Sequence, residues 1–591
     1  MRNLSFSIIC FSICFAFGYA GVSQWDRWNY WEKDKKLFSE YLHHSHPETS
    51  LTPSPKKASL SPRNQLSFQI AENTGLTFEY QNGDQKEYHL AETLGGGVGV
   101  FDFDNDGIND LVFVDGGIAY QPAKDQGNHL KIYRGFPEVK FQDITRASAL
   151  DWKGYGHGCI VGDVNNDGFD DLFITGYLST GFFLNQGDGT FQESTEASGL
   201  LINRWNGSAS FCDLDADGDV DLYVTGYADT PPSVPTPICK SGEQRIHCHP
   251  HHYDAIPDSI FENLGDGTFQ DRSEISAISK QQEYGLGVFI ADLNYDSRPD
   301  IFVANDGDRN LLFQNNGDWE FEEVGIVAGV AFNSKGRSMG SMGIACADFN
   351  TDGTLDLLTT NFSGERNVLF QNIGKMLFRD DSLNTPIDHA SRSLVGWAAI
   401  PIDGDYDGIM DLFVTNGHVT EMPEEMYRQP PLLMRGLPHG AWDDAHSAGD
   451  YFQQNWHGRG AAKADFNGDY RDDLIVSHIS DRPSILENRS SPFGNRVAIS
   501  LIGVNCDRNA ICASITYKIE ERLQIHQINL NNGYLCSEPG QVIIGIGEAT
   551  HVKDLTINWP RGEPTLIPKM IANTKLEIIQ GGEAIASGLP Y

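Results

Sequence analysis

Acidic side chains recur along this chain in one pattern, Asp-x-Asp/Asn-x-Asp followed by an Asp at the ninth position. Seven copies are present, and in five of them the sixth position is glycine. Hard divalent cations take oxygen ligands from short loops of this kind, and glycine permits the sharp turn that brings those oxygens to one centre. Ca²⁺ fits better than Mg²⁺, because flexible loops can supply six to eight oxygens. The predicted ligands of up to seven Ca²⁺ sites are Asp102, Asp104, Asp106 and Asp110; Asp163, Asn165, Asp167 and Asp171; Asp213, Asp215, Asp217 and Asp221; Asp292, Asn294, Asp296 and Asp300; Asp348, Asn350, Asp352 and Asp356; Asp403, Asp405, Asp407 and Asp411; and Asp465, Asn467, Asp469 and Asp473.

The seven loops differ in charge and in the residue at the turn. The first, third and sixth loops carry four Asp each, and we expect them to bind Ca²⁺ most tightly. The fourth and seventh carry three Asp, with Ser297 and Tyr470 where glycine is expected. Because left-handed backbone costs a residue with a side chain about 1–2 kcal/mol, these two loops are expected to lose their ion first.

The residues around each acidic loop predict β-strands. In the first copy an apolar, glycine-rich run at 97–101 enters the loop, and a β-branched and aromatic run at 111–114 leaves it. A third run follows at 130–133, and later copies show an Asp-Gly turn, such as 187–190, before a fourth strand. The first Asp residues of the copies span 363 residues in six intervals, a mean of about 60. Four antiparallel strands per unit, repeated seven times, predict an all-β, seven-bladed β-propeller.

Two features predict that this propeller closes on itself. Residues 68–76 resemble the fourth-strand sequence at 191–200 although they precede the first complete unit, and the last unit ends after its third strand at 484–487. An N-terminal strand that completes the seventh blade would remove an open sheet edge. A small residue also stands five positions before the first Asp of every copy, as expected where inner strands converge: Gly97, Gly158, Ser208, Gly287, Gly343, Ala398 and Gly460.

The acidic loops resemble those of FG-GAP (integrin α-type) repeats over residues 66–490, and residues 491–582 resemble the ASPIC/UnbV domain. The residues that carry the second resemblance are Asn509-Ala510-Ile511, Gly533-Tyr534-Leu535, Ile544-Gly545-Ile546-Gly547 and Trp559-Pro560-Arg561-Gly562. Together the two parts are similar to the cartilage acidic protein family. The resemblance implies structural Ca²⁺ in the loops between the first and second strands, away from the ligand-binding face. A small antiparallel β-domain is expected after the propeller, with residues 583–591 as a tail.

Cys239 and Cys248 lie in one short polar insert with several histidines. In an oxidising compartment they are disulfide candidates, and the resemblance favours this pairing, because related chains carry a paired-cysteine insert here. The alternative is a Zn²⁺ or copper site in the insert 239–252, since thiolates and imidazoles at close spacing suit those metals.

The remaining cysteines after the first twenty residues fall into two groups. Cys512 and Cys536 lie in the C-terminal region and are a second disulfide candidate, although Cys506 competes for either partner. Both positions depart from the family pattern. Three cysteines in apolar, strand-like runs are expected to be buried free thiols: Cys159, Cys212 and Cys346.

The N-terminal residues predict export. Arg2 precedes an apolar run at 4–17, and Gly18-Tyr19-Ala20 places small residues at a cleavage site, so residues 1–20 are expected to be a signal peptide. An uncleaved anchor helix is the alternative. Residues 21–65 contain an aromatic segment and a Pro/Ser linker. No later run is long enough for a membrane span, so the mature chain is expected to be secreted, extracellular or periplasmic.

The excess of acidic residues limits the kinds of molecule that this protein is expected to bind. Acidic residues outnumber basic ones 81 to 43, for a formal net charge of −38, which argues against nucleic acid as a partner. Gly336-Arg337-Ser338-Met339-Gly340 matches a hydrolase motif by spacing but does not lie on a strand-to-helix turn. We therefore expect a non-catalytic binding or adhesion module for an extracellular protein or glycan. The alternative is an extracellular enzyme or transition-metal-handling protein that uses the insert 239–252.

Overall fold

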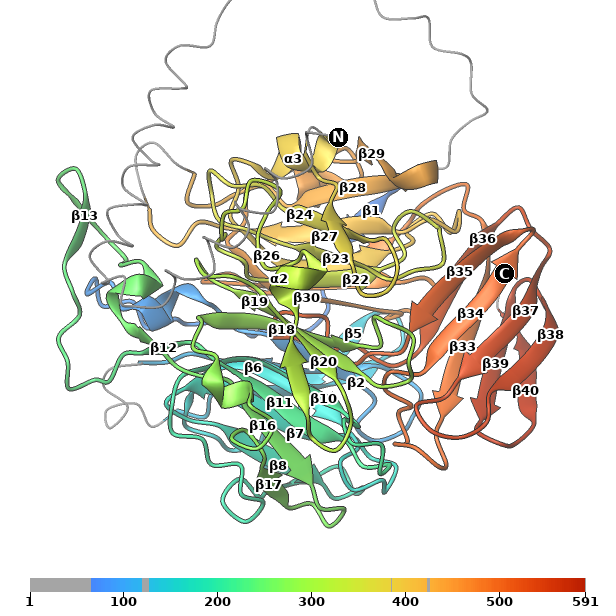
Figure 1. The fold of residues 1–591 in the computed structure, drawn as a ribbon, viewed down its shortest axis with the longest axis horizontal. Coiled ribbons are helices and arrows are strands. Elements are labelled where there is room, and N and C mark those ends of the chain that lie inside the picture. Colours follow the sequence, from blue (N-terminus) through green and yellow to red (C-terminus); the bar gives the residue numbers. More distant parts are fainter. Residues whose placement is uncertain (1–64, 119–126, 384, 422–425, 590–591) are drawn as a thin grey trace, which may run out of the picture. The chain divides into compact units, whose positions relative to one another are not determined.

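The computed structural model describes residues 65–118, 127–383, 385–421 and 426–589. The predicted signal peptide and nearly all of the segment 21–65 therefore lie outside the described residues. Within these ranges the chain is mainly β, with seven four-stranded antiparallel sheets and two further four-stranded sheets near the C-terminus (Figure 1).

Each of the seven sheets places its strands in the same order. The first strands are β2 (Val98–Phe101), β6 (Tyr155–Gly162), β10 (Asn206–Cys212), β18 (Gly285–Ala291), β22 (Ile344–Ala347), β26 (Gly396–Ile402) and β30 (Gly458–Ala464). The second strands are β3 (Asp110–Val114), β7 (Asp171–Tyr177), β11 (Asp221–Gly226), β19 (Asp300–Asn305), β23 (Asp356–Thr359), β27 (Asp411–Asn416) and β31 (Asp473–His478).

The outer strands complete the sheets. The third strands are β4 (Leu130–Phe136), β8 (Gly181–Asn185), β16 (Ser259–Asn263), β20 (Leu311–Asn315), β24 (Val368–Asn372), β28 (Leu432–Leu437) and β32 (Ser484–Asn488). The fourth strands are β5 (Lys140–Asp143), β9 (Phe191–Glu193), β17 (Phe269–Asp271), β21 (Phe321–Glu323), β25 (Phe378–Asp380), β29 (Ala441–Asp444) and, in the last sheet, β1 (Phe68–Ile70).

The order of the sheets along the chain is matched by contacts in space. First strands of successive sheets contact one another, and β30 of the last sheet contacts β2 of the first. β1 pairs antiparallel with β32 in the register Phe68 to Asn488. The apolar faces of neighbouring sheets pack together, as in the cluster that joins Phe173, Val224 and Val303. This is a propeller-like arrangement.

Short elements occupy the connections between the main strands. Two small two-stranded sheets lie between the second and third strands of the third sheet, and the other elements are helices of three to six residues. They are β12 (Ala228–Asp229) with β15 (Asp254–Ala255), β13 (Cys239–Ser241) with β14 (Gln244–Ile246), α2 (Gly325–Ala328), α3 (Pro386–Ser391), and the 3₁₀ turns η1 (Leu90–Thr93), η3 (Pro250–His252), η4 (Ile278–Lys280), η5 (Pro438–Gly440) and η6 (Asp450–Gln453).

The C-terminal part contains two sheets that share one apolar core. One has the order β36 (Val542–Gly547), β33 (Asn495–Ile502), β39 (Thr574–Ile579) and β40 (Ala584–Gly588). The other has the order β35 (Arg522–Gln527), β34 (Ser514–Ile519), β37 (His551–Asn558) and β38 (Thr565–Ile571).

Two expectations for this part were wrong. The domain is not purely antiparallel, because β33 and β39 pair in parallel. The predicted tail at 583–591 contributes β40, which pairs antiparallel with β39. Alternation of apolar residues predicts a strand but not its direction, and a parallel pair needs a long crossover that is invisible in local periodicity.

A segment of the C-terminal part, residues 529–538, contacts the first strand of each of the seven sheets. The Leu535 carbonyl accepts a hydrogen bond from Cys159 N–H of β6 at 3.0 Å, and the Leu535 N–H donates to Ser208 of β10 at 3.0 Å. Asn531 donates to the Val288 carbonyl of β18 at 3.4 Å. The remaining contacts are Ser537 with Val98 of β2, Gly533 with Ile344 of β22, Tyr534 with Trp397 of β26 and Asn532 with Ala461 of β30.

The small residues of the first strands leave space for this segment. A Cβ atom on Gly97 would overlap the Leu535 carbonyl oxygen, and one on Gly460 would lie 2.5 Å from the Cys536 sulfur. From the sequence alone, these small residues are attributed to crowding among the inner strands where they converge. The structure adds a second cause, a segment from the far end of the chain.

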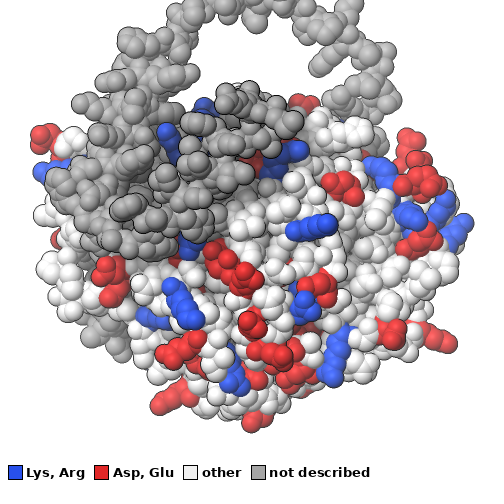
Figure 2. Space-filling view, viewed as in Figure 1, with Lys and Arg blue, Asp and Glu red and all other residues white. Residues whose placement is uncertain are grey.

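Acidic side chains are interspersed with basic ones on the face drawn in Figure 2. Among the described residues, no helix is both long and apolar enough to cross a bilayer.

Candidate metal centres

Every acidic motif occupies the same place in its sheet. Its first Asp follows the last residue of the first strand, and its ninth residue is the first residue of the second strand. All seven motifs are thus connecting loops between the first and second strands, and the sheets position 28 predicted ligands in seven equivalent sets.

The first Asp of each motif closes its own loop. Asp102 accepts hydrogen bonds from Asp106 N–H at 3.0 Å and from Gly107 N–H at 2.7 Å, one on each carboxylate oxygen. The same pair of bonds is made by Asp163, Asp213, Asp292, Asp348, Asp403 and Asp465. The sixth residue takes positive φ in each loop, including Ser297 at 68° and Tyr470 at 55°. The left-handed turn predicted for these two residues is confirmed.

The ninth Asp fastens the loop to two strands. Asp110 accepts from Phe103 N–H at 3.0 Å and from Gly135 N–H of β4 at 2.7 Å. Equivalent bonds are made by Asp171, Asp221, Asp300, Asp356, Asp411 and Asp473. This residue therefore has a structural role besides the predicted ligation.

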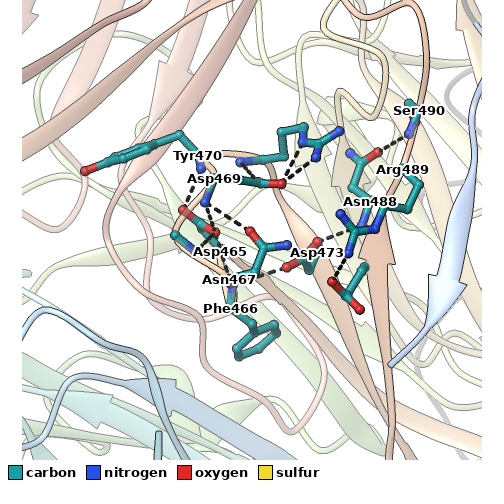
Figure 3. A network of polar contacts seen from close by, with 12 residues as sticks. Asp465, Phe466, Asn467, Asp469, Tyr470, Asp473, Asn488, Arg489 and Ser490 are labelled. Atoms are coloured by element: carbon teal, nitrogen blue, oxygen red, sulfur yellow. Dashed lines mark hydrogen bonds and ion pairs between the residues drawn. The ribbon is translucent and has the colours of Figure 1, made fainter. Parts of the chain in front are cut away.

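The seventh motif shows the arrangement at close range (Figure 3). Asp465 accepts from Gly468 N–H at 2.8 Å and Tyr470 N–H at 2.7 Å, while Asp473 accepts from Phe466 N–H at 3.2 Å and Asn488 N–H at 2.7 Å. The side chains of both acids point into the loop (Figure 3).

The donor sets fit Ca²⁺. In the first, third and sixth motifs, oxygens at positions 1, 3 and 9 lie within 4.8 Å of one another. Asp104 Oδ1 is buried and accepts no hydrogen bond from the described residues. A buried carboxylate oxygen without a partner is costly, and a bound cation would supply that partner. All ligands offered are oxygens, as Ca²⁺ requires.

Burial makes the ionised carboxylates unfavourable without a cation. Burial raises the pKa of Asp110 and of Asp300 to about 8, with smaller contributions from neighbouring Asp charges. In the third loop, burial followed by the charges of Asp217 and Asp215 raises the pKa of Asp213 to about 7. A divalent ion would reverse these shifts by favouring the charged form.

Two arginines that the sequence analysis missed lie against the first and sixth loops. Arg134 of β4 contacts Asp104 at 2.7 Å and Asp106 at 2.9 Å. Arg435 of β28 contacts Asp405 at 2.5 Å and Asp407 at 3.2 Å. The corresponding residue of the third sheet is Glu262. The sequence analysis expects these three loops to bind Ca²⁺ most tightly, and the two arginines now distinguish among them, so the third loop becomes the strongest candidate.

Replacing Arg134 with methionine should tighten Ca²⁺ binding to the first loop. Removing a positive charge within 3 Å of two ligands is expected to raise affinity about tenfold or more (~1.4 kcal/mol). Hydrogen–deuterium exchange of peptide 102–110 during a Ca²⁺ titration reads this site separately. Arg379→Met, at an exposed pair with Asp381, is the matched control. An unchanged midpoint for Arg134→Met would contradict the assignment.

A repeated asparagine at the end of five third strands also escaped the sequence analysis. Asn185 donates through its side chain to the Phe103 carbonyl at 2.9 Å, in the acidic loop of the preceding sheet. The same link is made by Asn263, Asn315, Asn372 and Asn488. The first and sixth sheets have Gly135 and Gly436 instead, directly after the two arginines. In the sequence, the asparagine recurs in five of the seven units, and in four of them it stands directly before the turn that leads to the fourth strand. This recurrence could have revealed the link between neighbouring sheets.

The cysteine insert forms the predicted disulfide. Cys239 and Cys248 are bonded across the base of the β13–β14 hairpin. His252 lies near the two sulfurs, but disulfide sulfurs are not the thiolates that Zn²⁺ or copper would bind. His247 instead contacts Thr420 at 2.7 Å, which ties the insert to the connection between β27 and β28 of the sixth sheet.

The predicted Cys512–Cys536 disulfide is wrong, because the structure contains no bond between these two cysteines and gives them different neighbours. Cys536 lies in segment 529–538 and accepts from Val98 N–H at 3.2 Å, whereas Cys512 Sγ lies 3.0 Å from Cys212 Sγ. Proximity in sequence misled here, since the chain between these cysteines crosses to the seven sheets. Cys159 and Cys212 are buried free thiols as expected, and Cys346 is a partly exposed one.

Comparisons with known proteins agree with these two parts of the chain. The FG-GAP-like repeat matches residues 163–224 and 292–359, and the ASPIC and UnbV family matches residues 503–585. The chain is 27% identical to human cartilage acidic protein 1 over 57% of its own length and 52% of that protein. For the mouse protein the identity is 28%, over 57% and 53%. The chain thus spans about half the length of the curated relatives it matches.

Solved structures give weaker similarity. An Agrocybe aegerita lectin that recognises non-reducing terminal N-acetylglucosamine matches with a TM-score of 0.37 and 14% identity, over 76% of this chain and all of that one. At this TM-score the similarity does not establish a shared fold or ligand.

Proposed function

Because this chain carries FG-GAP-like repeats and an ASPIC/UnbV domain and is homologous to cartilage acidic protein 1 at about 27% identity, we propose that it is a Ca²⁺-stabilised, seven-bladed β-propeller that acts as a non-catalytic extracellular binding module. In this proposal residues 66–490 form the propeller, β1 closes its seventh blade, and residues from 491 form the second domain.

The observation that carries the proposal is the repetition of one loop geometry in seven sheets. Each loop carries carboxylate or amide side chains at positions 1, 3, 5 and 9, and each is closed by the same backbone hydrogen bonds. In the first, third and sixth loops the oxygens at positions 1, 3 and 9 lie within 4.8 Å of one another. Acidic turns without an ion would not need three or four charges in each loop, since like charges at this spacing repel. The pairing of β1 with β32 and the contact of β30 with β2 support closure.

Export and a protein or glycan ligand complete the proposal. The apolar N-terminal run and the Cys239–Cys248 disulfide support an oxidising compartment. The loops lie between first and second strands, which leaves the opposite connections free for a ligand, as in the propellers that the repeats resemble.

Direct metal analysis tests the first part. After dialysis against Ca²⁺, elemental analysis should find several Ca²⁺ per chain, and treatment with EDTA should remove them. Asp215→Asn is a clean variant, because four other loops carry Asn at this position and the amide can keep the bond to Asp217 N–H at 3.1 Å. It should lower the affinity of the third loop about tenfold or more. Retention of Zn²⁺ or copper, with no Ca²⁺, would overturn the proposal.

A glycan and extracellular-protein array tests the second part. Specific binding is expected in Ca²⁺ and should be lost in EDTA, because the loops support the blades that carry the binding face. Turnover of a substrate rather than simple binding would contradict the non-catalytic assignment.

A further inference from the structure

Two buried cysteines from distant parts of the chain face each other. Cys212 ends β10 and Cys512 precedes β34, 300 residues further on. Their sulfurs are 3.0 Å apart, and the side chains are 0% and 6% exposed. A covalent S–S bond measures about 2.05 Å, so the two sulfurs need to approach by only about 1 Å.

We propose that Cys212 and Cys512 form a second disulfide, which joins the third sheet of the propeller covalently to the ASPIC/UnbV domain. The proposal rests on the oxidising compartment inferred above. Both cysteines are free thiols in the structure, so the proposed bond is a modification of the chain, made as it folds.

The surroundings hold the two cysteines in place. Asp163 N–H donates to Asn509 at 3.0 Å, and Asn509 donates in turn to Asp170 at 3.0 Å. Arg561 donates to the Asp217 carbonyl at 2.7 Å, on the loop that follows Cys212. These hydrogen bonds keep the two cysteines adjacent in the native arrangement, so a bond made during folding would fit that arrangement with only a small shift of the sulfurs.

Other cysteines of the C-terminal part have different neighbours. Cys506 Sγ lies 3.6 Å from Gln580 Oε1, and Cys536 Sγ receives Val98 N–H at 3.2 Å. Cys512 is thus the partner that the geometry selects for Cys212.

The chemistry is disulfide exchange with an external disulfide, such as glutathione disulfide or an oxidoreductase. One cysteine thiolate attacks it, forms a mixed disulfide and releases one thiol. The second cysteine then attacks the protein sulfur of the mixed disulfide and releases the second thiol. Two protein thiols lose two protons and two electrons, and the external disulfide gains them. Because both sulfurs are buried in the folded chain, exchange occurs during folding.

Peptide mapping of the full-length chain, exported from a secreting host, tests this. The protein is denatured with N-ethylmaleimide and no reductant, then digested. We expect a Cys212–Cys512 cross-linked peptide that disappears after reduction. Cys239–Cys248 serves as an internal control. If Cys239–Cys248 is oxidised while Cys212 and Cys512 carry N-ethylmaleimide, this inference is wrong and the proposed export stands.

Refolding in vitro tests the Cys212–Cys512 bond independently of whether the protein is exported. The reduced chain is refolded in glutathione and glutathione disulfide, where the cross-linked peptide should again form even if natural export fails. Absence of the cross-link from correctly folded protein would overturn the inference.

A pair of double variants adds a stability readout. The reductant-dependent fall in melting temperature should be about 5 °C or more larger in wild type than in Cys212→Ala/Cys512→Ala, because a cross-link over 300 residues restricts the unfolded chain strongly. Cys159→Ala/Cys346→Ala, which removes two cysteines that are free in the structure, should keep the wild-type fall. Equal falls in wild type and the Cys212/Cys512 variant would count against the bond.

Discussion

Chelation of Ca²⁺ is expected to lower the melting temperature of this protein by more than about 10 °C. Extracellular Ca²⁺ modules bind with dissociation constants near 10⁻⁴–10⁻³ M. At free Ca²⁺ one hundred times the dissociation constant, linkage gives about 2.7 kcal/mol per site. Weaker saturation gives less, but several sites together approach the whole stability of a typical domain. Differential scanning calorimetry in Ca²⁺ and in EDTA measures the difference.

The Asp215→Asn variant is the control for this effect. It removes one charge from the third loop, whose carboxylates form no ion pair with an arginine among the described residues, so it should lower the melting temperature in Ca²⁺ and leave it nearly unchanged in EDTA. A wild-type protein whose melting temperature is the same with and without chelator would mean that the loops are acidic turns without an ion.

The metal-free protein should also respond to pH with an unusual sign. Burial raises the pKa of Asp110, Asp171, Asp300 and Asp356 from 3.8 to about 8. Between these values the folded state binds more protons than the unfolded state, so stability falls as pH rises from about 4 to about 8. In EDTA the melting temperature should therefore be higher at pH 5.5 than at pH 7.5. Saturating Ca²⁺ should remove this slope, because the ion holds the carboxylates ionised.

The repeated strands were predictable from sequence because each motif marks two boundaries. Asp at position 1 ends one strand and Asp at position 9 begins the next in all seven sheets. The β1 strand was predictable because its sequence repeats that of other fourth strands. The Cys239–Cys248 disulfide followed from the short insert and is confirmed.

What the sequence did not reveal depends on distant contacts. Arg134 lies 28 residues beyond Asp106, and only the pairing of β3 with β4 brings its side chain to the loop. Cys212 meets Cys512 across 300 residues, and no local pattern links them. The parallel pairing of β33 with β39 likewise follows from the packing of the whole C-terminal part rather than from strand periodicity.

Replacing Tyr534 with alanine should destabilise the sheets and the C-terminal domain together. Tyr534 is fully buried, its ring lies 5.6 Å from that of Trp397, and its hydroxyl donates to the Leu94 carbonyl at 3.0 Å. Loss of a buried aromatic side chain costs about 3–5 kcal/mol, and here the Leu94 carbonyl also loses its donor. The sequence places a boundary near residue 490, yet segment 529–538 touches all seven first strands.

Calorimetry with a matched variant distinguishes joint destabilisation of the sheets and the C-terminal domain from destabilisation of the C-terminal domain alone. Leu566→Ala, on the same domain but 63% exposed, should change the melting temperature little. Tyr534→Ala should shift a single transition that includes the propeller sheets, and hydrogen–deuterium exchange of strands such as β26, which contains Trp397, should follow it. The reason is that the first strands are packed against the segment as well as against one another. If the C-terminal domain melted separately and the sheets kept the wild-type midpoint, the segment would be a passive neighbour and truncation near residue 490 would be harmless.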